Sequence, residues 1–225
     1  MVRLIFPDIF KPHVTAFFTE KNPGVDIHEI GRLLKIRGEN IFMPIQKHTD
    51  KVLILESSRS PVIADAVATK GKGVLLGVQT ADCVPVLIYE KKKGVSGAVH
   101  AGWKGTAEGI LKKTIAALTE RFICRAEDML VAIGPSIRGC CYEVDYDVMH
   151  GVSRATGQGE YFRKKGEKYY LDLAAANRMQ ALSMGVSKKN IWISPDCTFE
   201  NPDRYCSYRF AKGTTGRQGG FIGKI

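Results

Sequence analysis

Six stretches of the chain consist mainly of aliphatic and β-branched residues with little polar alternation. They are residues 52–57, 73–80, 84–90, 94–100, 129–135 and 190–194. Strands that are buried on both faces show such continuous apolar runs, whereas strands with one face in water alternate between apolar and polar positions. The pattern therefore predicts sheets that are covered on both sides.

Helical spacing of apolar residues appears in fewer places. Apolar side chains recur at intervals of four, three and four from Leu111 to Phe122, behind Thr106 as a candidate N-cap. A second helix is predicted over residues 172–185, with an aspartate as its N-cap and a glycine at its end, and a third helix is expected to begin near Asp145. Hairpin-linked strands with separate helices are typical of an α+β layered sandwich.

Composition narrows the class of protein. The chain has 225 residues, of which 44% are hydrophobic, and no segment reads as a linker, so a single domain over residues 1–225 is expected. Its apolar runs reach at most about ten residues, and Pro7, Asp8 and Pro12 interrupt the first one, so we expect a cytoplasmic protein without a membrane partner. Six cysteines are too few for a disulfide scaffold and predict reduced thiols.

The charge is strongly positive, with 33 basic and 23 acidic residues and a formal net charge of +10. An anionic partner such as phosphate is therefore attractive. Many of the lysines fall in turns, and no Cys/His finger or RNP-type aromatic motif is present, so a nucleic-acid partner is not expected. A monomer or a weak homo-oligomer is the expected state.

The stretch TADCVPVLIYEKKKGVSGAVHAGWKGT, residues 80–106, places two chemically competent residues near one predicted hairpin. A two-residue turn at Lys91 and Lys92 sets Cys83 opposite His100, and a longer turn leaves the pair diagonal. Either register brings the two Cβ atoms within about 5 to 8 Å. Pro85 argues against a regular central strand, because proline favours an edge or a bulge.

His48 is a third candidate, in a turn before the strand that begins at Val52. Two imidazoles and one thiolate form a three-ligand set that zinc accepts with its fourth position open, as in catalytic sites. Sequence spacing does not show whether His48 reaches Cys83 and His100, so an ordinary turn histidine stays open. Cys140, Cys141, Cys197 and Cys206 are expected to be buried small apolar side chains rather than ligands.

The backbone after His100 offers a further element. Gly102 and Gly105 permit a tight turn, and a helix that follows directs its free N–H groups back toward the end of the strand. This arrangement is a candidate binding site for an anion.

Six motifs resemble one known family in order and spacing. They are QxHxxxV at 46–52, TADC at 80–83, HAGWKG at 100–105, IGPSIxxxxYEV at 133–144, LDL at 171–173 and SYR…TGR at 207–217. Over residues 14–222 the chain thus resembles the YfiH family, which is also called the laccase-domain or polyphenol oxidase family and is described as purine nucleoside phosphorylases.

The resemblance implies a layered α/β/β/α sandwich with mixed sheets and a metal, usually zinc, bound by His48, Cys83 and His100. It also implies phosphorolysis of adenosine, inosine, guanosine and methylthioadenosine, with purine nucleosides and phosphate as partners, and hydrolytic deamination of adenosine; some members are associated with peptidoglycan editing. The chain departs from the family pattern in the short region 22–40 and at Thr49, where family members carry a glycine.

Further roles follow from motif positions. Asp82 is a candidate for proton transfer or for orienting a ligand, and the alternative is a carboxylate that organises the turn. Arg209 and the helix start after Gly102 are candidates for the phosphate. Gln46 and Tyr142 are possible contacts to the base or ribose, with hydrogen-bonded packing as the alternative.

Three competing functions stay open at this stage. The first is a metal-free cysteine hydrolase or amidase that uses a Cys83–His100 dyad. The second is copper-dependent oxidation of phenols, although a multicopper laccase is expected to need about ten histidines and this chain has five. The third is a basic binding protein without turnover.

Overall fold

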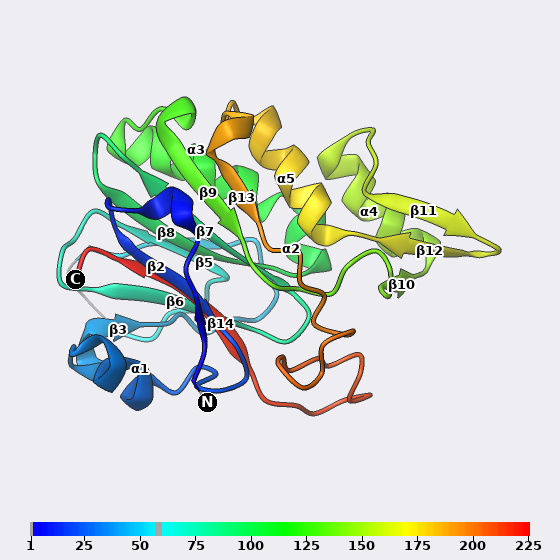
Figure 1. The fold of residues 1–225 in the computed structure, drawn as a ribbon. Coiled ribbons are helices and arrows are strands. Elements are labelled where there is room, and N and C mark those ends of the chain that lie inside the picture. Colours follow the sequence, from blue (N-terminus) through cyan, green and yellow to red (C-terminus); the bar gives the residue numbers. More distant parts are fainter. Residues whose placement is uncertain (1, 57–59) are drawn as a thin grey trace.

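The computed structural model describes residues 2–56 and 60–225. Two mixed sheets lie face to face, and helices cover the outer side of each sheet (Figure 1). The predicted α/β/β/α sandwich is therefore confirmed. The last residue of the predicted strand 52–57 lies outside the described residues.

The larger sheet has six strands in the order β13-β9-β7-β8-β5-β4. Its strand bounds are Val52–Ile54 for β4, Ala66–Thr69 for β5, Val84–Glu90 for β7, Val95–Ala101 for β8, Met129–Ile133 for β9 and Ile191–Ile193 for β13. Every residue of β7, β8 and β9 is buried, as the apolar runs predicted. The β13–β9 and β4–β5 pairs are parallel, and the other pairs are antiparallel.

The second sheet has five strands in the order β1-β2-β14-β6-β3. The bounds are Leu4–Ile5 for β1, Thr15–Thr19 for β2, Ile41–Phe42 for β3, Leu75–Thr80 for β6 and Gln218–Gly223 for β14. The last strand of the chain pairs between β2 and β6, so both ends of the sequence contribute to this sheet. Of its strands, the hydrophobic pattern predicted only β6.

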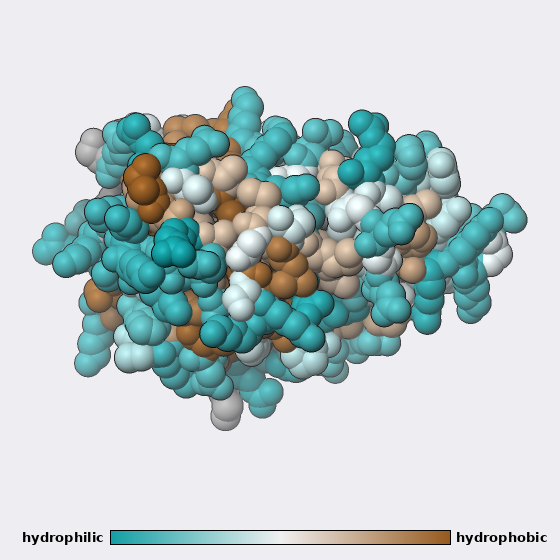
Figure 2. Space-filling view, turned by 90° about the horizontal axis from the view of Figure 1, so that it is seen from above, coloured by the Kyte–Doolittle hydropathy of each residue, from teal (hydrophilic) through white to brown (hydrophobic). Residues whose placement is uncertain are grey.

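The helices are α1 (Ile27–Leu34), α2 (Trp103–Ala107), α3 (Ile110–Phe122), α4 (Tyr146–Thr156) and α5 (Leu173–Ser183). A small third sheet, of order β10-β12-β11, projects beside α4 (Figure 1). Its strands are Glu143–Val144, Phe162–Lys165 and Lys168–Leu171 for β10, β11 and β12. Seen from the side of α3 and α5, hydrophilic residues surround the face, and a band of apolar residues runs across its middle (Figure 2).

Three apolar clusters lie between these layers. One cluster, which includes Leu111 and Val131, packs α3, α4 and α5 on the six-stranded sheet. A second, which includes Leu76 and Leu87, fills the space between the two sheets, and a third packs Ile30 of α1 on the outer face of the five-stranded sheet. The four layers thus follow from burial of apolar surface on both faces of each sheet.

The hairpin between β7 and β8 differs from the two-residue turn considered above. Glu90 pairs with Val95, so four residues form the turn, and Pro85 rather than Cys83 lies opposite His100. Gly94 adopts a φ of 70°, a left-handed conformation that glycine accepts without strain. Cys83 is therefore diagonal to His100, which is the longer-turn alternative.

Pro85 occupies a central strand, contrary to the expectation of an edge or a bulge. It lies one residue before the ladder between β7 and β9 begins at Val86, so its missing N–H removes no bond of that ladder. Its carbonyl accepts the N–H of Gly134 at 2.8 Å.

The predicted helix after Gly105 is broken into two. Gly109 has a φ of 69° and separates α2 from α3, so Thr106 lies inside α2 and is not an N-cap. The Thr106 hydroxyl instead accepts a hydrogen bond from the Asn177 side chain of α5 at 3.0 Å. Leu111, Ile115 and Leu118 of the predicted stripe are buried, and Phe122 is half-buried. The helices after Asp145 and Asp172 are confirmed.

Within residues 2–56 and 60–225, no helix combines the length and the apolar character that a membrane crossing requires.

Candidate metal centre and its cavity

Three donor side chains from distant parts of the chain meet at one end of the six-stranded sheet. His48 lies in the loop before β4, Cys83 immediately precedes β7, and His100 is the next to last residue of β8. Because β7 and β8 are antiparallel, the start of one lies beside the end of the other. The donor atoms of all three residues lie within 4.8 Å of one another. The structure thus brings together the three residues proposed as metal ligands.

The distances are those of a coordination sphere. Cys83 Sγ lies 3.9 Å from His48 Nε2, and the two imidazole rings have centroids 4.9 Å apart at 75° to each other. A tetrahedral zinc ion separates a thiolate sulfur from an imidazole nitrogen by about 3.6 Å. One sulfur and two nitrogens are donors that zinc accepts, and three protein ligands leave a position for a reactant. The residues therefore fit a catalytic metal ion.

Asp65, immediately before β5, contacts two of the three proposed ligands, and the sequence analysis missed it. Its Oδ1 accepts the Nδ1–H of His100 at 2.7 Å and the backbone N–H of His48 at 3.0 Å. A carboxylate on Nδ1 fixes the tautomer of a histidine, so that Nε2 is available to a metal. The residues before β5 carry no motif, and only the pairing of β5 with β8 brings Asp65 to His100.

The loop that carries His48 wraps around the same carboxylate. The backbone N–H groups of Lys47 and Thr49 both donate to Asp65 Oδ2, and so does the Thr49 hydroxyl at 2.8 Å. His48 itself has a φ of 57°, a left-handed conformation that is strained for a residue with a side chain. Thr49, which departs from the family pattern, therefore adds a hydrogen bond to the aspartate that holds the strained loop.

The ionisation of the site depends on mutual charges. Burial opposes the ionised Cys83, but the positive charges of the neighbouring imidazoles outweigh burial and lower its pKa to about 6. Burial likewise opposes protonation of His100, but Cys83 and Asp65 raise its pKa to about 9. For Asp65, the hydrogen bonds from His100 and Thr49 overcome burial and lower the pKa. Cys83 is thus a thiolate at neutral pH, the form that binds metals.

Gly102 packs directly against the donors. A Cβ atom at this position would lie 3.0 Å from Cys83 Sγ and 3.1 Å from His48 Cδ2. Gly102 is also the N-cap of α2, which has only five residues. Close approach of the backbone to the donors thus explains a glycine here.

A cavity of about 520 Å³ opens beside the three donors. Trp103, Tyr142 and Tyr208 contribute aromatic surface to its walls, and Arg209 and Arg217 contribute positive charge. This volume is within the range of small-molecule sites. The cavity therefore offers stacking surface, cationic groups and a candidate metal centre to one ligand.

Arg209 and Tyr142, two residues singled out in the sequence, form one unit on the cavity wall. The guanidinium lies 5.1 Å from the centroid of the Tyr142 ring, and its Nη1 donates to the carbonyl of Glu143 at 3.0 Å. Burial, followed by the charge of Cys83, raises the pKa of Tyr142 to about 12, so its hydroxyl stays protonated.

Asp82 lies at the cavity but is bonded to the protein scaffold. Its Oδ1 accepts the Thr198 hydroxyl at 2.6 Å, and its Oδ2 accepts the backbone N–H of Arg209 at 2.7 Å. Its carbonyl accepts the N–H of Ile137 at 3.0 Å. These contacts favour the alternative in which Asp82 organises the turn over a role in proton transfer.

The Gln46 side chain is likewise hydrogen-bonded to the protein rather than free for a ligand. Its side-chain amide donates to the carbonyl of Gln79 at 2.8 Å and accepts the N–H of the same residue at 2.8 Å. The amide therefore joins the His48 loop to the end of β6, which favours the packing alternative for this residue.

The other three histidines lie away from the candidate metal centre. His13 stacks on Tyr89 and His150 stacks on Tyr146, while His28 lies on α1. Among the described residues, only His48 and His100 belong to a group that could hold a metal ion. The copper cluster of a multicopper laccase has no matching histidine set in this part of the chain.

Comparison with known proteins gives a consistent picture. Residues 26–224 match the model of the family described as "Multi-copper polyphenol oxidoreductase laccase". A protein from Clostridium acetobutylicum named purine nucleoside phosphorylase is 39% identical over 79% of this chain and 74% of its own length.

Solved structures agree with the sequence relatives. The crystal structure of YlmD from Geobacillus stearothermophilus superposes with a TM-score of 0.90 at 30% identity, covering 96% of this chain and 93% of the other. That of the hypothetical protein YfiH from Bacillus licheniformis gives 0.88 at 28% identity, with coverages of 94% and 93%.

Proposed function

The chain belongs to the laccase-like family that includes YfiH, and from this membership and the geometry of the site we propose that it is a zinc-dependent purine nucleoside phosphorylase that also deaminates adenosine. The observation that carries the proposal is that one thiolate and two imidazoles meet beside a cavity lined by arginines and aromatic rings. Relatives named purine nucleoside phosphorylase support the substrate class.

Phosphorolysis requires a phosphate near the anomeric carbon and a stabilised purine. A phosphate oxygen forms a bond to C1′ while the bond from C1′ to N9 breaks, and the purine leaves with the electron pair. Arg209 is suited to the phosphate, because its planar guanidinium binds two oxygens and is held over Tyr142. We assign this task to Arg209 rather than to the start of α2, since Gly102 faces the donor side chains.

The purine is expected to lie against the aromatic wall of the cavity. Trp103 and Tyr142 are both half-buried and line it, so they offer flat apolar surface to a base. The Tyr142 hydroxyl, which stays protonated, is a donor for a ring nitrogen or a ribose oxygen.

The deaminase branch uses the same centre. A bound zinc ion supplies Lewis-acid activation of water or substrate. The chain's part is to hold the backbone of His48 and the imidazole of His100 in place through Asp65. Addition of water at C6 of adenine followed by loss of ammonia gives inosine.

Product analysis tests the proposal. Zinc-loaded wild type and Cys83→Ala are incubated with adenosine, with and without phosphate. Free adenine and ribose 1-phosphate that appear only with phosphate support phosphorolysis, and inosine supports deamination. Identical products and rates from the two proteins would show that the site is misassigned.

Arg209→Ala separates the two reactions. It should weaken the phosphate dependence far more than the deamination rate, because only phosphorolysis needs the anion. Arg154→Ala is the matched control, since Arg154 is an exposed arginine on α4 away from the cavity. Equal losses of both activities in Arg209→Ala would contradict the assigned role.

One observation favours a second candidate, a metal-free cysteine hydrolase or amidase. The lowered pKa of Cys83 gives a thiolate next to a protonated His100, which is the arrangement of an activated nucleophile. Hydrolytic activity that persists after metal removal and is lost on alkylation of Cys83 would support this candidate.

Metal content also tests the copper alternative that the family description suggests. Divalent copper binds many N/S donor sets more tightly than zinc does. Oxidation of phenols that depends on copper bound at His48, Cys83 and His100 should therefore disappear when the protein is loaded with zinc.

A further inference from the structure

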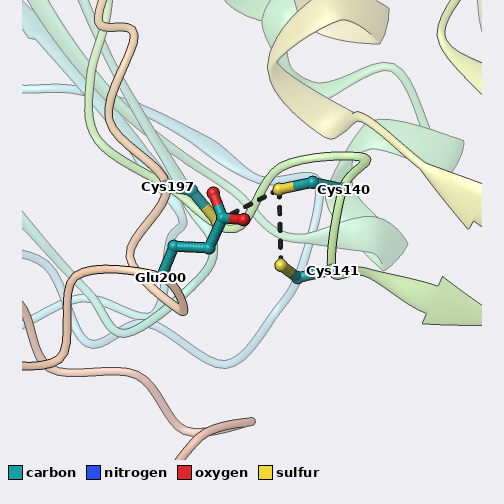
Figure 3. A group of neighbouring side chains, drawn as sticks. All are labelled: Cys140, Cys141, Cys197 and Glu200. Carbon is teal, nitrogen blue, oxygen red and sulfur yellow. Dashed lines mark hydrogen bonds between the residues drawn. The ribbon is translucent and has the colours of Figure 1, made fainter.

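A second group of donors lies outside the candidate metal centre, where two loops meet. Cys140 and Cys141 come from the turn before β10, and Cys197 and Glu200 come from the segment after β13 (Figure 3). Cys140 Sγ lies 3.3 Å from Cys141 Sγ and 3.7 Å from Cys197 Sγ. The four donor atoms lie within 4.8 Å of one another.

Packing does not account for these thiols. The sequence analysis expected buried apolar cysteines, but Cys140 is exposed and Cys141 is half-buried. Cys197 is buried, as are Cys124 and Cys206, which belong to no donor group among the described residues. An exposed thiol gains little from apolar burial, so the gathering of three sulfurs at one point needs another explanation.

The two loops are held together by contacts other than the thiols. Ser136 pairs with Cys197 in an isolated bridge, and the N–H of Thr198 donates to the carbonyl of Ser136 at 3.1 Å. Arg138 donates to the carbonyl of Ser194 at 2.7 Å. The protein scaffold therefore sets the donor positions, and an ion at this point would find a preorganised site.

We propose that Cys140, Cys141, Cys197 and Glu200 form a second metal site, which binds zinc through three thiolates and one carboxylate. A tetrahedral zinc ion separates two thiolate sulfurs by about 3.8 Å, and the pair formed by Cys140 and Cys197 is already at 3.7 Å. Soft thiolates select zinc over calcium or magnesium. The thiol protons are released to solvent when the ion binds.

A cavity of about 630 Å³ adjoins the second site, and its lining carries charges of both signs. Arg138 and Arg163 supply positive charge, although Arg138 is already paired with Asp172 at 3.0 Å. The same cavity reaches Cys140, Cys197 and Glu200, so it gives an ion access from solvent.

The second site also adjoins the candidate metal centre along the chain. Cys141 immediately precedes Tyr142, which lines the substrate cavity. Cys197 immediately precedes Thr198, whose hydroxyl bonds to Asp82, the neighbour of Cys83. An ion at the second site thus clamps the two loops that support the cavity, and we expect it to raise the thermal stability of the protein.

Metal counting tests the proposal in the reduced, full-length protein. Wild type dialysed against buffered zinc should bind about two ions per chain, and Cys140→Ser/Cys141→Ser should bind about one. His48→Ala/Cys83→Ala should also keep about one ion, and cobalt(II) in that variant should give intense thiolate-to-cobalt charge-transfer absorption. Zinc should raise the Tm of His48→Ala/Cys83→Ala but not that of a variant that combines both pairs of substitutions.

Two controls keep the result interpretable. Cys124→Ala removes a buried thiol outside the group and should leave the zinc content unchanged. Glu200→Gln removes the carboxylate at an exposed position, where folding is not at risk, and should weaken zinc binding at the second site.

The proposal would be overturned if His48→Ala/Cys83→Ala, which keeps all four donors of the second site, bound no zinc. It would equally be overturned by Cys140→Ser/Cys141→Ser that binds as much zinc as wild type. Both results are independent of catalysis, so loss of phosphorylase activity alone would not affect this inference.

Discussion

Asp65 Oδ1 accepts the Nδ1–H of His100 at 2.7 Å, and this one bond joins the start of β5 to the end of β8 at the candidate metal centre. The pair is buried, with 5% of the His100 side chain and none of the Asp65 side chain exposed. Since the same oxygen accepts the backbone N–H of His48, a single carboxylate positions two of the three proposed ligands.

Replacement of this carboxylate should loosen the metal centre. Asp65→Asn places an amide N–H₂ group among backbone N–H donors and weakens the hold on the His100 imidazole and on the backbone of His48. We expect zinc affinity to fall by about 10- to 100-fold, the usual effect of losing a partner of a metal-bound histidine. Competition with a chromophoric chelator measures the affinity.

Asp50→Asn serves as the control for that experiment. Asp50 forms an exposed ion pair with Lys113 in the same loop region, so its replacement should leave the zinc affinity unchanged. Equal affinities of Asp65→Asn and Asp50→Asn would contradict the orienting role of Asp65.

Gly102→Ala should disturb the donors by direct contact. The new methyl group would approach Cys83 Sγ and His48 Cδ2 to about 3 Å, closer than ordinary van der Waals contact. Zinc affinity and activity should both fall, while the far-UV spectrum stays that of the wild type. Gly38→Ala is the matched control, because no atom lies within 4 Å of its added methyl group. If Gly102→Ala bound zinc with wild-type affinity, a close approach of this backbone position to Cys83 and His48 would be contradicted.

Thiol reactivity should depend on pH in a way that identifies Cys83. Its pKa is lowered to about 6, so in metal-free protein the thiolate fraction is nearly complete at pH 7 and decreases as the pH falls through 6. The alkylation rate by iodoacetamide should therefore have its midpoint near pH 6, instead of about 8.5 for an unperturbed cysteine.

Cys124 provides the internal comparison. Burial, followed by the charge of Glu90, raises its pKa to about 11, so it should react slowly at neutral pH. Peptide mapping by mass spectrometry assigns the modified residue. A fast phase that survives in Cys83→Ala would mean that another thiol is responsible.

Leu111→Ala should destabilise the fold. Leu111 of α3 is fully buried against the six-stranded sheet. Its truncation should therefore lower the free energy of unfolding by about 2 to 5 kcal/mol. Leu33→Ala on α1 is the control. Because Leu33 is 36% exposed, this substitution should lower the free energy of unfolding much less. Denaturant unfolding followed by circular dichroism measures both. Similar losses in the two variants would show that the α3 stripe does not anchor the layer.

Several elements could be predicted from local pattern. The apolar runs of β7, β8 and β9 identified central strands, and the spacing from Leu111 identified the buried face of α3, because both signals depend on neighbouring positions alone. The break at Gly109 was missed, since a glycine in a helical pattern does not reveal its φ.

The candidate metal centre could also be predicted only as far as local sequence features reach. The diagonal relation between Cys83 and His100 followed from a hairpin, which is a short-range feature. His48 entered through the family resemblance, and its approach to Cys83 depends on a loop held in a left-handed conformation.

By itself the sequence determined which segments are apolar enough to become strands and helices, and which residue types could bind a metal. Only the tertiary structure decided that Asp65 bonds to the His100 imidazole and to the His48 backbone. It also decided that Asp82 and Gln46 are hydrogen-bonded within the protein and that Cys197 joins Cys140 and Cys141. The physical reason is that these contacts join segments many residues apart, and their geometry is set by strand pairing and loop conformation rather than by any periodicity along the chain.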